Sequence, residues 1–255
     1  MPVTNAKNYL SSLQDDREIY IDGERIKDVT KDYRFIGAAE TMAELLQMQH
    51  DPDLSDTLTY SSPSSGDKVG MSHIQPRSIK DVKARGDAMK VWMDATCGML
   101  GRSPDYKNVM VAAWAAAAEV FDRPSFDGSE NIQNFYEFVR ENDSTMTHVL
   151  VNPQVDRSKP AHLQESEIVA QIVKETDAGI IVRGARMVAT LCALANEIVV
   201  MPAAVTWHTT ETHKTTDYAF GFAIPTSTPG LKFICRPPVA HFDAASPMDG
   251  PLSLR

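Results

Sequence analysis

The hydrophobic pattern of this chain changes at one stretch, Thr147-His-Val-Leu-Val-Asn-Pro-Gln-Val-Asp-Arg157. Before about residue 145, apolar side chains recur with the 3.6-residue period of helices, and beyond it they alternate with the period of two that is typical of strands. Helices followed by a series of short strands indicate two layers or two domains. We therefore predict an α+β fold, with a mainly helical domain at 1–145 and an antiparallel β-barrel or sandwich domain at 146–255.

Four helices are expected before that stretch. The first runs from about residue 35 to 50, and the second begins after Ser78, where Asp81 adds an acidic residue in the first turn. The third is expected from Pro104 to about Phe121, and the fourth begins with Ser129 as its N-cap.

Strands are expected at both ends of the chain. Residues 18–26 predict a hairpin that turns at Asp22-Gly23, and residues 168–182 predict a second hairpin. Further short strands are predicted at 186–190, 197–201, 218–224 and 231–235.

The charge, the hydrophobic pattern and the motifs of the sequence exclude several classes of function. A net charge of −9 argues against nucleic acid or an anionic membrane as partners, and no apolar run has the length of a membrane span. Cys97, Cys192 and Cys235 lack metal-binding spacing, so we expect no metal site and interpret them as buried, reduced thiols of a cytoplasmic protein. No GxGxxG, GxxxxGK[ST], HExxH or GxSxG motif occurs. An enzyme built on this chain would therefore bind its cofactor without those motifs.

The stretch Met99-Leu-Gly-Arg-Ser-Pro-Asp-Tyr106 is the first candidate site. Ser103-Pro104 is typical of a helix start, which places Arg102 at the positive end of the helix dipole. That placement is unfavourable unless an anion binds nearby. Tyr106, at the third helical position, can direct its hydroxyl to the same place. The alternative is a capped surface helix whose arginine points into water.

The 147–157 stretch itself is the second candidate site. His148 titrates near neutral pH, and Gln154, Asp156 and Arg157 place amide, carboxylate and guanidinium groups on one loop. Such groups can hold the polar edge of a heterocycle or a pyrophosphate. The alternatives are a hydrogen-bonded core histidine and a solvated Asp156–Arg157 pair.

Four motifs in this order resemble one enzyme family. They are Gly101-Arg-Ser-Pro-Asp-Tyr106, Thr147-His148 with Asn152-Pro-Gln-Val-Asp-Arg157, Arg183-Gly-Ala-Arg-Met-Val-Ala-Thr190 and Pro225-Thr-Ser-Thr-Pro-Gly230. The chain resembles the oxygenase component of the 4-hydroxyphenylacetate 3-monooxygenases, which are two-component, flavin-dependent aromatic hydroxylases. The resemblance implies an acyl-CoA-dehydrogenase-like fold and a C-terminal helical domain that would follow the residues present here.

The resemblance also implies a chemistry. Reduced FAD, supplied by a separate flavin reductase, reacts with O2 to give a C4a-hydroperoxyflavin, which hydroxylates a phenol ortho to its hydroxyl group. Arg102, Tyr106 and His148 match the positions that hold the phenol and stabilise the hydroperoxide. The positions that match flavin contacts are Gln154, Val155, Asp156, Arg157 and Thr190. A homotetramer is implied when the C-terminal domain is present, and residues 1–255 alone are expected to bind reduced FAD poorly.

Two alternatives stay open. A 4-hydroxybutyryl-CoA dehydratase-like flavoprotein would need clustered cysteine ligands, but four residues after Cys97 stands Gly101. A truncated, non-catalytic module of the hydroxylase family is the second. The phenol itself, whether 4-hydroxyphenylacetate, a chlorophenol or a larger phenolic compound, is left open by the sequence.

Overall fold

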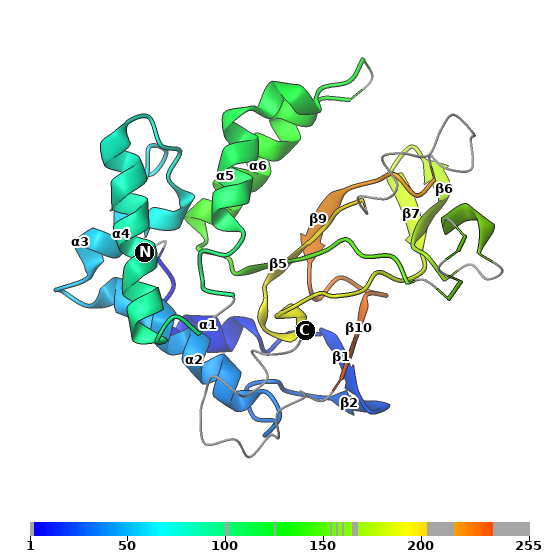
Figure 1. Cartoon of the computed structure of the whole chain (residues 1–255), viewed down its shortest axis with the longest axis horizontal. Coiled ribbons are helices and arrows are strands. Elements are labelled where there is room, and N and C mark those ends of the chain that lie inside the picture. The colour runs from blue at the N-terminus through cyan, green and yellow to red at the C-terminus, as the bar shows by residue number, and fades with distance from the viewer. Residues whose placement is uncertain are drawn as a thin grey trace.

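The computed structural model describes residues 3–99, 102–124, 126–153, 155–156, 158–159, 161–164, 168–202 and 217–236. Figure 1 shows the α-helices on the left and at the top, with most strands on the right. The α-helices are α1 (Ala6–Ser12), α2 (Ile36–Gln47), α3 (Ser55–Leu58), α4 (Ile79–Ala95), α5 (Asn108–Ala116) and α6 (Gly128–Glu141). Short 3-10 helices are η1 (Met48–His50), η2 (Met71–His73), η3 (Ala118–Phe121), η4 (Ala161–Leu163) and η5 (Cys192–Leu194).

The helix predicted to follow Ser78 is confirmed, together with its capping. The Ser78 hydroxyl accepts a hydrogen bond from the backbone N–H of Asp81 at 3.2 Å, and the Asp81 carboxylate accepts from the N–H of Ser78 at 2.9 Å. This reciprocal pair satisfies two of the N–H groups that a helix start leaves without partners. The first predicted helix is also present, as α2 continued by η1.

Two predicted helix starts were wrong. The third helix begins at Asn108, not Pro104, because the Ser103 hydroxyl donates to the Asp105 carboxylate instead of capping a helix. Tyr106 therefore lies in a turn before α5. The fourth helix is capped by Asp127, whose carboxylate accepts from the N–H of Glu130 at 2.9 Å.

The strands form small sheets. They are β1 (Glu18–Ile21), β2 (Glu24–Ile26), β3 (Thr59–Ser61), β4 (Lys68–Gly70), β5 (Met146–Val149), β6 (Gln171–Thr176), β7 (Gly179–Arg183), β8 (Glu197–Val200), β9 (Phe222–Pro225) and β10 (Lys232–Cys235). Both predicted hairpins are confirmed, as β1–β2 and β6–β7. The first turns at Asp22 and Gly23 with positive φ at both, as a two-residue hairpin turn requires.

The predicted antiparallel barrel was wrong. The described strands form separate sheets in the orders β10-β1-β2, β3-β4, β5-β8-β9 and β6-β7, and both the β1–β10 and β5–β8 pairs are parallel. Residues 186–190 form no strand, only an isolated bridge between Met187 and Val151, and the 218–224 strand is reduced to β9. Parallel pairing joins segments far apart in the chain, so local alternation does not reveal it. The division at 145/146 stays a prediction, and β10 pairs with β1 across it.

The main core joins the two ends of the chain. Its fully buried members include Tyr9, Phe35, Leu194 and Ile198, which come from α1, the start of α2, η5 and β8. The Tyr9 hydroxyl donates to the Leu194 carbonyl at 2.7 Å. Burial of these side chains therefore fixes η5 and the segment before it against the N-terminal helices.

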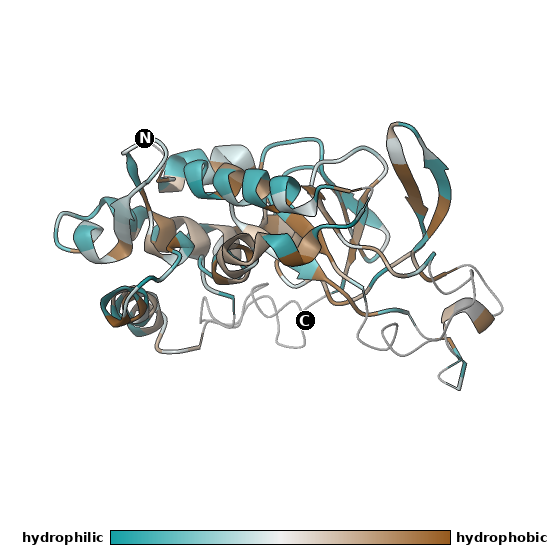
Figure 2. Cartoon of the chain, turned by 90° about the horizontal axis from the view of Figure 1, so that it is seen from above, coloured by the Kyte–Doolittle hydropathy of each residue, from teal (hydrophilic) through white to brown (hydrophobic). Residues whose placement is uncertain are grey.

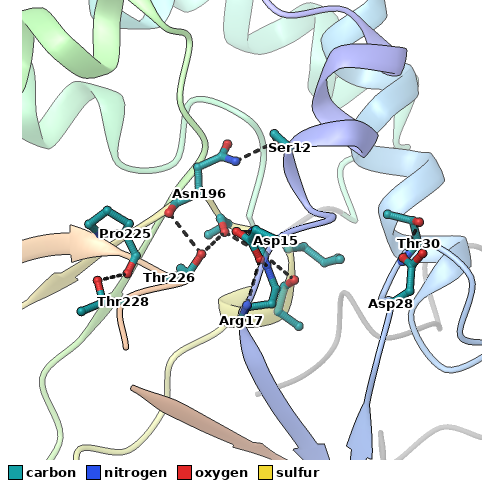
Figure 3. Close-up of polar contacts among 12 residues, drawn as sticks. Ser12, Asp15, Arg17, Asp28, Thr30, Asn196, Pro225, Thr226 and Thr228 are labelled. Carbon is teal, nitrogen blue, oxygen red and sulfur yellow. Dashed lines mark hydrogen bonds and ion pairs between the residues drawn. The ribbon is translucent and has the colours of Figure 1, made fainter. Parts of the chain in front are cut away.

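A buried arginine reinforces this junction (Figure 3). The Arg17 guanidinium donates to the carbonyls of Ala193 and Ala195 at 2.8 and 3.0 Å and pairs with Asp15. Thr226 donates to the Ala195 carbonyl at 2.8 Å. Because a buried carbonyl without a partner is costly, these bonds define one arrangement of η5.

The cysteines are only partly as predicted. All three are free, and the Sγ atoms of Cys192 and Cys235 lie 4.0 Å apart inside the structure. Cys97 is exposed, so its predicted burial was wrong. Over the described ranges, no helix has both the length and the apolar character needed to cross a bilayer.

Candidate active site

Two of the predicted residues meet directly. The Tyr106 hydroxyl lies 2.9 Å from Nδ1 of His148, and their ring centroids are 5.6 Å apart. His148 lies in β5, where Thr147 and Val149 on either side are buried and side chains alternate between the two faces. The strand thus directs His148 away from its buried neighbours and toward the turn that carries Tyr106.

Two cations stand over the Tyr106 ring. The Arg102 guanidinium carbon and the Lys107 ammonium nitrogen each lie 4.2 Å from the ring centroid. Both distances are in the range of cation–π contacts. Arg102 was predicted from the sequence, and the structure brings it to Tyr106 and His148. Lys107 was missed, although a second cation directly after Tyr106 was a signal available in the sequence. We call Arg102, Tyr106, Lys107 and His148 the cationic cluster.

Burial and charge set the protonation states in this cluster. Burial, and then the charges of Lys107 and Arg102, lower the pKa of His148 to about 4. Burial raises the pKa of Tyr106, and the positive charge of Arg102 acts in the opposite direction. At neutral pH the imidazole is therefore uncharged and the phenol protonated, and the imidazole tautomer decides which of the two donates in the Tyr106–His148 hydrogen bond.

Buried polar contacts hold the turn that carries the cluster. Asp105 is buried and accepts from Ser103, and burial raises the pKa of its carboxyl group. At the start of α5, the Asn108 amide donates to the Ser72 hydroxyl at 2.8 Å, and both side chains are buried. The turn is therefore fixed at both ends, which limits how far Tyr106 can move.

Val151, just before the stretch that is predicted to contact flavin, lies beside a second segment. Val151 bridges to Met187, whose N–H donates to the Val151 carbonyl at 2.7 Å. Val151, Val155, Met187 and Val188 are all exposed, and Val155 is the most so at 73 %. We call these four residues the 151/187 surface. Thr190, three residues after Met187, is buried, and its carbonyl accepts from the Thr147 hydroxyl next to His148.

Some polar side chains of this region have hydrogen-bond partners, and others have none among the described residues. The Asp156 carboxylate accepts from the N–H and hydroxyl of Ser158 and pairs with Lys159 at 3.4 Å, so its own loop occupies it. In contrast, Nε and Nη1 of Arg186 and Oδ1 of Asn152 are buried without hydrogen-bond partners in the part of the chain that the structure describes. Gln154 and Arg157, also predicted here, lie outside the described residues.

The backbone of the same segment is strained. Val188 and Leu191 both have φ of 67°, in the left-handed region. A β-branched residue there is an outlier, and each such residue costs on the order of 1–2 kcal/mol. Strained residues of this kind concentrate at functional sites, and here they flank Thr190.

Comparison with known proteins identifies the family of this chain. The family described as "4-hydroxyphenylacetate 3-hydroxylase N terminal" matches residues 5–255. The chain belongs to this family.

Relatives and solved structures of the 4-hydroxyphenylacetate 3-hydroxylase family cover nearly the whole length of this chain. The oxygenase component of 4-hydroxyphenylacetate 3-monooxygenase from Thermus thermophilus is 43 % identical over 238 residues, which are 93 % of this chain and 47 % of that protein. A crystal structure of such an oxygenase component, complexed with FAD and 4-hydroxyphenylacetate, is 41 % identical with a TM-score of 0.84, over 99 % of this chain and 50 % of that one. The chain thus spans about half the length of the relatives that it matches.

A more distant structure shares the fold alone. An archaeal 4-hydroxybutyryl-CoA dehydratase from N. maritimus is 20 % identical with a TM-score of 0.74, over 91 % of this chain and 45 % of that one. At that identity, it carries no argument about the activity of this chain.

Proposed function

We propose that this chain is part of the oxygenase component of a two-component monooxygenase, which uses reduced FAD and O2 to hydroxylate a phenol ortho to its hydroxyl group. The observation that carries the proposal is the hydrogen bond between Tyr106 and a neutral His148 beneath the Arg102 guanidinium. Membership of the 4-hydroxyphenylacetate 3-hydroxylase family supports the same reaction. A dehydratase-like activity is not favoured, because its structural relative shows only a shared fold.

The cationic cluster supplies what a phenol needs in order to react. A phenol becomes a strong carbon nucleophile when its proton is shared with a base, and a neutral imidazole is such a base. His148 is neutral at pH 7 because burial and two cations lower its pKa. The Arg102 guanidinium stabilises the negative charge that develops on the phenol oxygen. Tyr106 holds the imidazole in place.

The 151/187 surface and its neighbours fit a flavin. An exposed apolar surface suits an isoalloxazine ring, and the partnerless nitrogens of Arg186 suit an anionic group. We propose that the residues holding reduced FAD are Gln154, Val155, Asp156, Arg157 and Thr190. When bound, reduced FAD supplies the activation of O2, and the protein supplies placement and exclusion of water.

We propose further features on the resemblance to the same family. They are an acyl-CoA-dehydrogenase-like arrangement with a helical domain at 1–145 and a strand domain at 146–255, a separate flavin reductase as partner, a homotetramer and a cytoplasmic location. The name "oxygenase component" of the Thermus relative supports the proposal of a separate reductase as partner.

Substitution of Arg102 tests the proposal. In the intact protein supplied with reduced FAD, Arg102→Ala removes a charge-assisted hydrogen bond to an anion, worth roughly 1.5–3 kcal/mol. We expect hydroxylated product to fall roughly ten- to hundredfold and hydrogen peroxide per reduced flavin to rise. Arg25→Ala, at an exposed position of β2, is the matched control.

Two outcomes would overturn the proposal. An unchanged yield of hydroxylated product in Arg102→Ala would show that Arg102 has no role in the reaction. If the unmodified intact protein neither changes the absorbance of added reduced FAD nor forms product from any phenol, the chain belongs to a non-catalytic module.

A further inference from the structure

Lys107 is the member of the cationic cluster that has no role in the reaction proposed above. Its ammonium group lies 4.2 Å from the centre of the Tyr106 ring, the same separation as for Arg102, while the hydroxyl of that ring meets His148. Two positive charges therefore lie over the ring that carries this hydroxyl group. Among the described residues, the charged and titratable groups that contact Tyr106 are Arg102 and Lys107, from the turn before α5, and His148, from β5.

The two cations that share the Tyr106 ring repel each other, although the ring attracts each of them. Lys107 is half-buried and forms no ion pair within the described ranges. Burial, and then the positive charge of Arg102, lower the pKa of Lys107, because half-burial removes part of the water around its ammonium group and a second cation lies close by. Asp105 is the nearest carboxyl group in sequence, but it accepts from Ser103, and Arg85 is the cation that stabilises its charge. An anion that binds at the Tyr106 hydroxyl would supply a negative charge to pair with the Lys107 ammonium group.

We propose that Lys107 is a specificity-determining residue that makes this site bind its phenol as the phenolate. The proposal rests on the proposed function, because it assumes that a phenol binds at Tyr106 and His148. On binding, the phenol O–H bond breaks, the electron pair stays on oxygen, and the proton passes through His148 to solvent, which returns the imidazole to its neutral form. Lys107 and Arg102 supply the positive charge that makes this ionisation favourable below the ordinary phenol pKa near 10. His148 stays neutral because a third positive charge is disfavoured there.

The inference also predicts which phenols the site selects. A site that holds the anion binds acidic phenols more tightly, because less free energy is needed to remove their proton. Affinity should therefore rise as the phenol pKa falls, and Lys107 should determine how steeply it rises. An uncharged residue at position 107 would flatten this dependence.

The test uses 4-nitrophenol, whose neutral and anionic forms differ in visible absorbance. The intact protein is titrated with this phenol under anaerobic conditions with reduced FAD, and the pKa of the bound phenol is read from the spectra. We expect that pKa to lie below that of free 4-nitrophenol. In Lys107→Met it should rise by about one unit, which is a tenfold change in the ionisation constant. Lys107→Arg keeps the charge and should retain most of the effect, and Lys80→Met, at the exposed start of α4, controls for the loss of one positive charge.

The outcomes separate this inference from the proposed function. If the protein binds and hydroxylates phenols, and the bound phenol has the same pKa in Lys107→Met as in the unmodified protein, Lys107 has no such role and the inference is wrong. A Lys107→Met protein that binds no phenol, while Lys107→Arg binds normally, supports the need for the charge. If the unmodified protein binds no phenol at all, both the proposed function and the inference fail.

Discussion

The cationic cluster and the 151/187 surface are built in opposite ways. In the cluster, the side chains of this chain contact one another, with Tyr106 hydrogen-bonded to His148 and two cations over its ring. On the 151/187 surface, four apolar side chains are exposed and the nearby Arg186 keeps two nitrogens without partners among the residues described. The first region is organised by its own contacts, whereas the second exposes apolar groups to solvent.

The same contrast appears in the strands. All four residues of β8 are buried, whereas the β6–β7 hairpin exposes Val173, Ile180 and Ile181. In Figure 2 the hairpin on the right carries hydrophobic positions away from the rest of the molecule. Exposed apolar groups that lie together mark surfaces that bind a ligand or another part of a protein. Under the proposed function, the cationic cluster is the substrate side of the site and the 151/187 surface is its cofactor side.

The largest expected effect concerns cofactor binding by residues 1–255 alone. We expect this segment to bind reduced FAD weakly and to form little or no hydroxylated product. A flavin on an open surface meets a dielectric close to that of water, which weakens each polar contact. Calorimetry with anaerobically reduced FAD measures this. A dissociation constant of about a micromolar or tighter, together with product formation, would show that the 151/187 surface is already complete.

A second prediction concerns the hydrogen bond in the cationic cluster. Tyr106→Phe keeps the ring beneath both cations but removes the hydroxyl that holds His148. We expect kcat/KM of the intact protein to fall by a few-fold to tenfold, since a hydrogen bond contributes about 0.5–1.5 kcal/mol. Steady-state kinetics with the reductase in excess provides the measurement, and Tyr33→Phe, at an exposed position, is the control. Equal kinetics in Tyr106→Phe and the unmodified protein would mean that His148 is positioned by other contacts.

The pH dependence of His148 offers a third comparison. Its pKa is lowered from 6.5 to about 4, so between these pH values the unfolded chain binds a proton that the folded protein does not. The resulting contribution to stability is complete above pH 6.5 and is lost as the pH falls toward 4. NMR titration of the imidazole, assigned with His148→Gln, should give a midpoint far below 6.5. Lys107→Met should raise that midpoint, and a midpoint at 6.5 in the unmodified protein would contradict the description of the cluster.

The smallest expected effect concerns strain beside the 151/187 surface. Val188→Gly relieves a left-handed φ at a half-exposed position and should stabilise the protein by about 1 kcal/mol or less, because the added flexibility of glycine in the unfolded chain offsets part of the gain. Met187→Gly, next to it and without positive φ, should instead destabilise by about 0.5–1 kcal/mol. Urea unfolding compares the two. Destabilisation of similar size in both would show that Val188 is not strained.

Some local signals in the sequence were reliable. Ser78 with Asp81 predicted a helix start because capping depends on residues three apart, and Asp22-Gly23 predicted a hairpin because positive φ is a property of the turn itself. Ser103 was misread because its hydroxyl has two local partners available, and the structure gives it to Asp105. The sequence offered no means of choosing between them.

Local sequence patterns did not predict the contacts between segments that are distant in the chain. Residues 102–106 and His148 were each singled out, but only the family resemblance placed them in one site. The parallel β1–β10 and β5–β8 pairs were missed because alternation predicts a strand and says nothing about its partner. The roles of Arg102, Tyr106, His148 and Thr190 stay predictions that the experiments above address.

The β1–β10 pairing has a consequence for how the protein is made. Ile19 and Ile21 are fully buried in the finished fold, but their strand neighbours Phe233 and Cys235 come roughly 200 residues later in the chain. At about 5–20 residues per second, a ribosome needs roughly 10–40 s to synthesise that interval. Throughout that time one edge of β1 stays without its permanent neighbour. The nascent chain is therefore a natural client for chaperones that bind exposed strands, and synonymous codons that slow translation before residue 232 would prolong this vulnerable period.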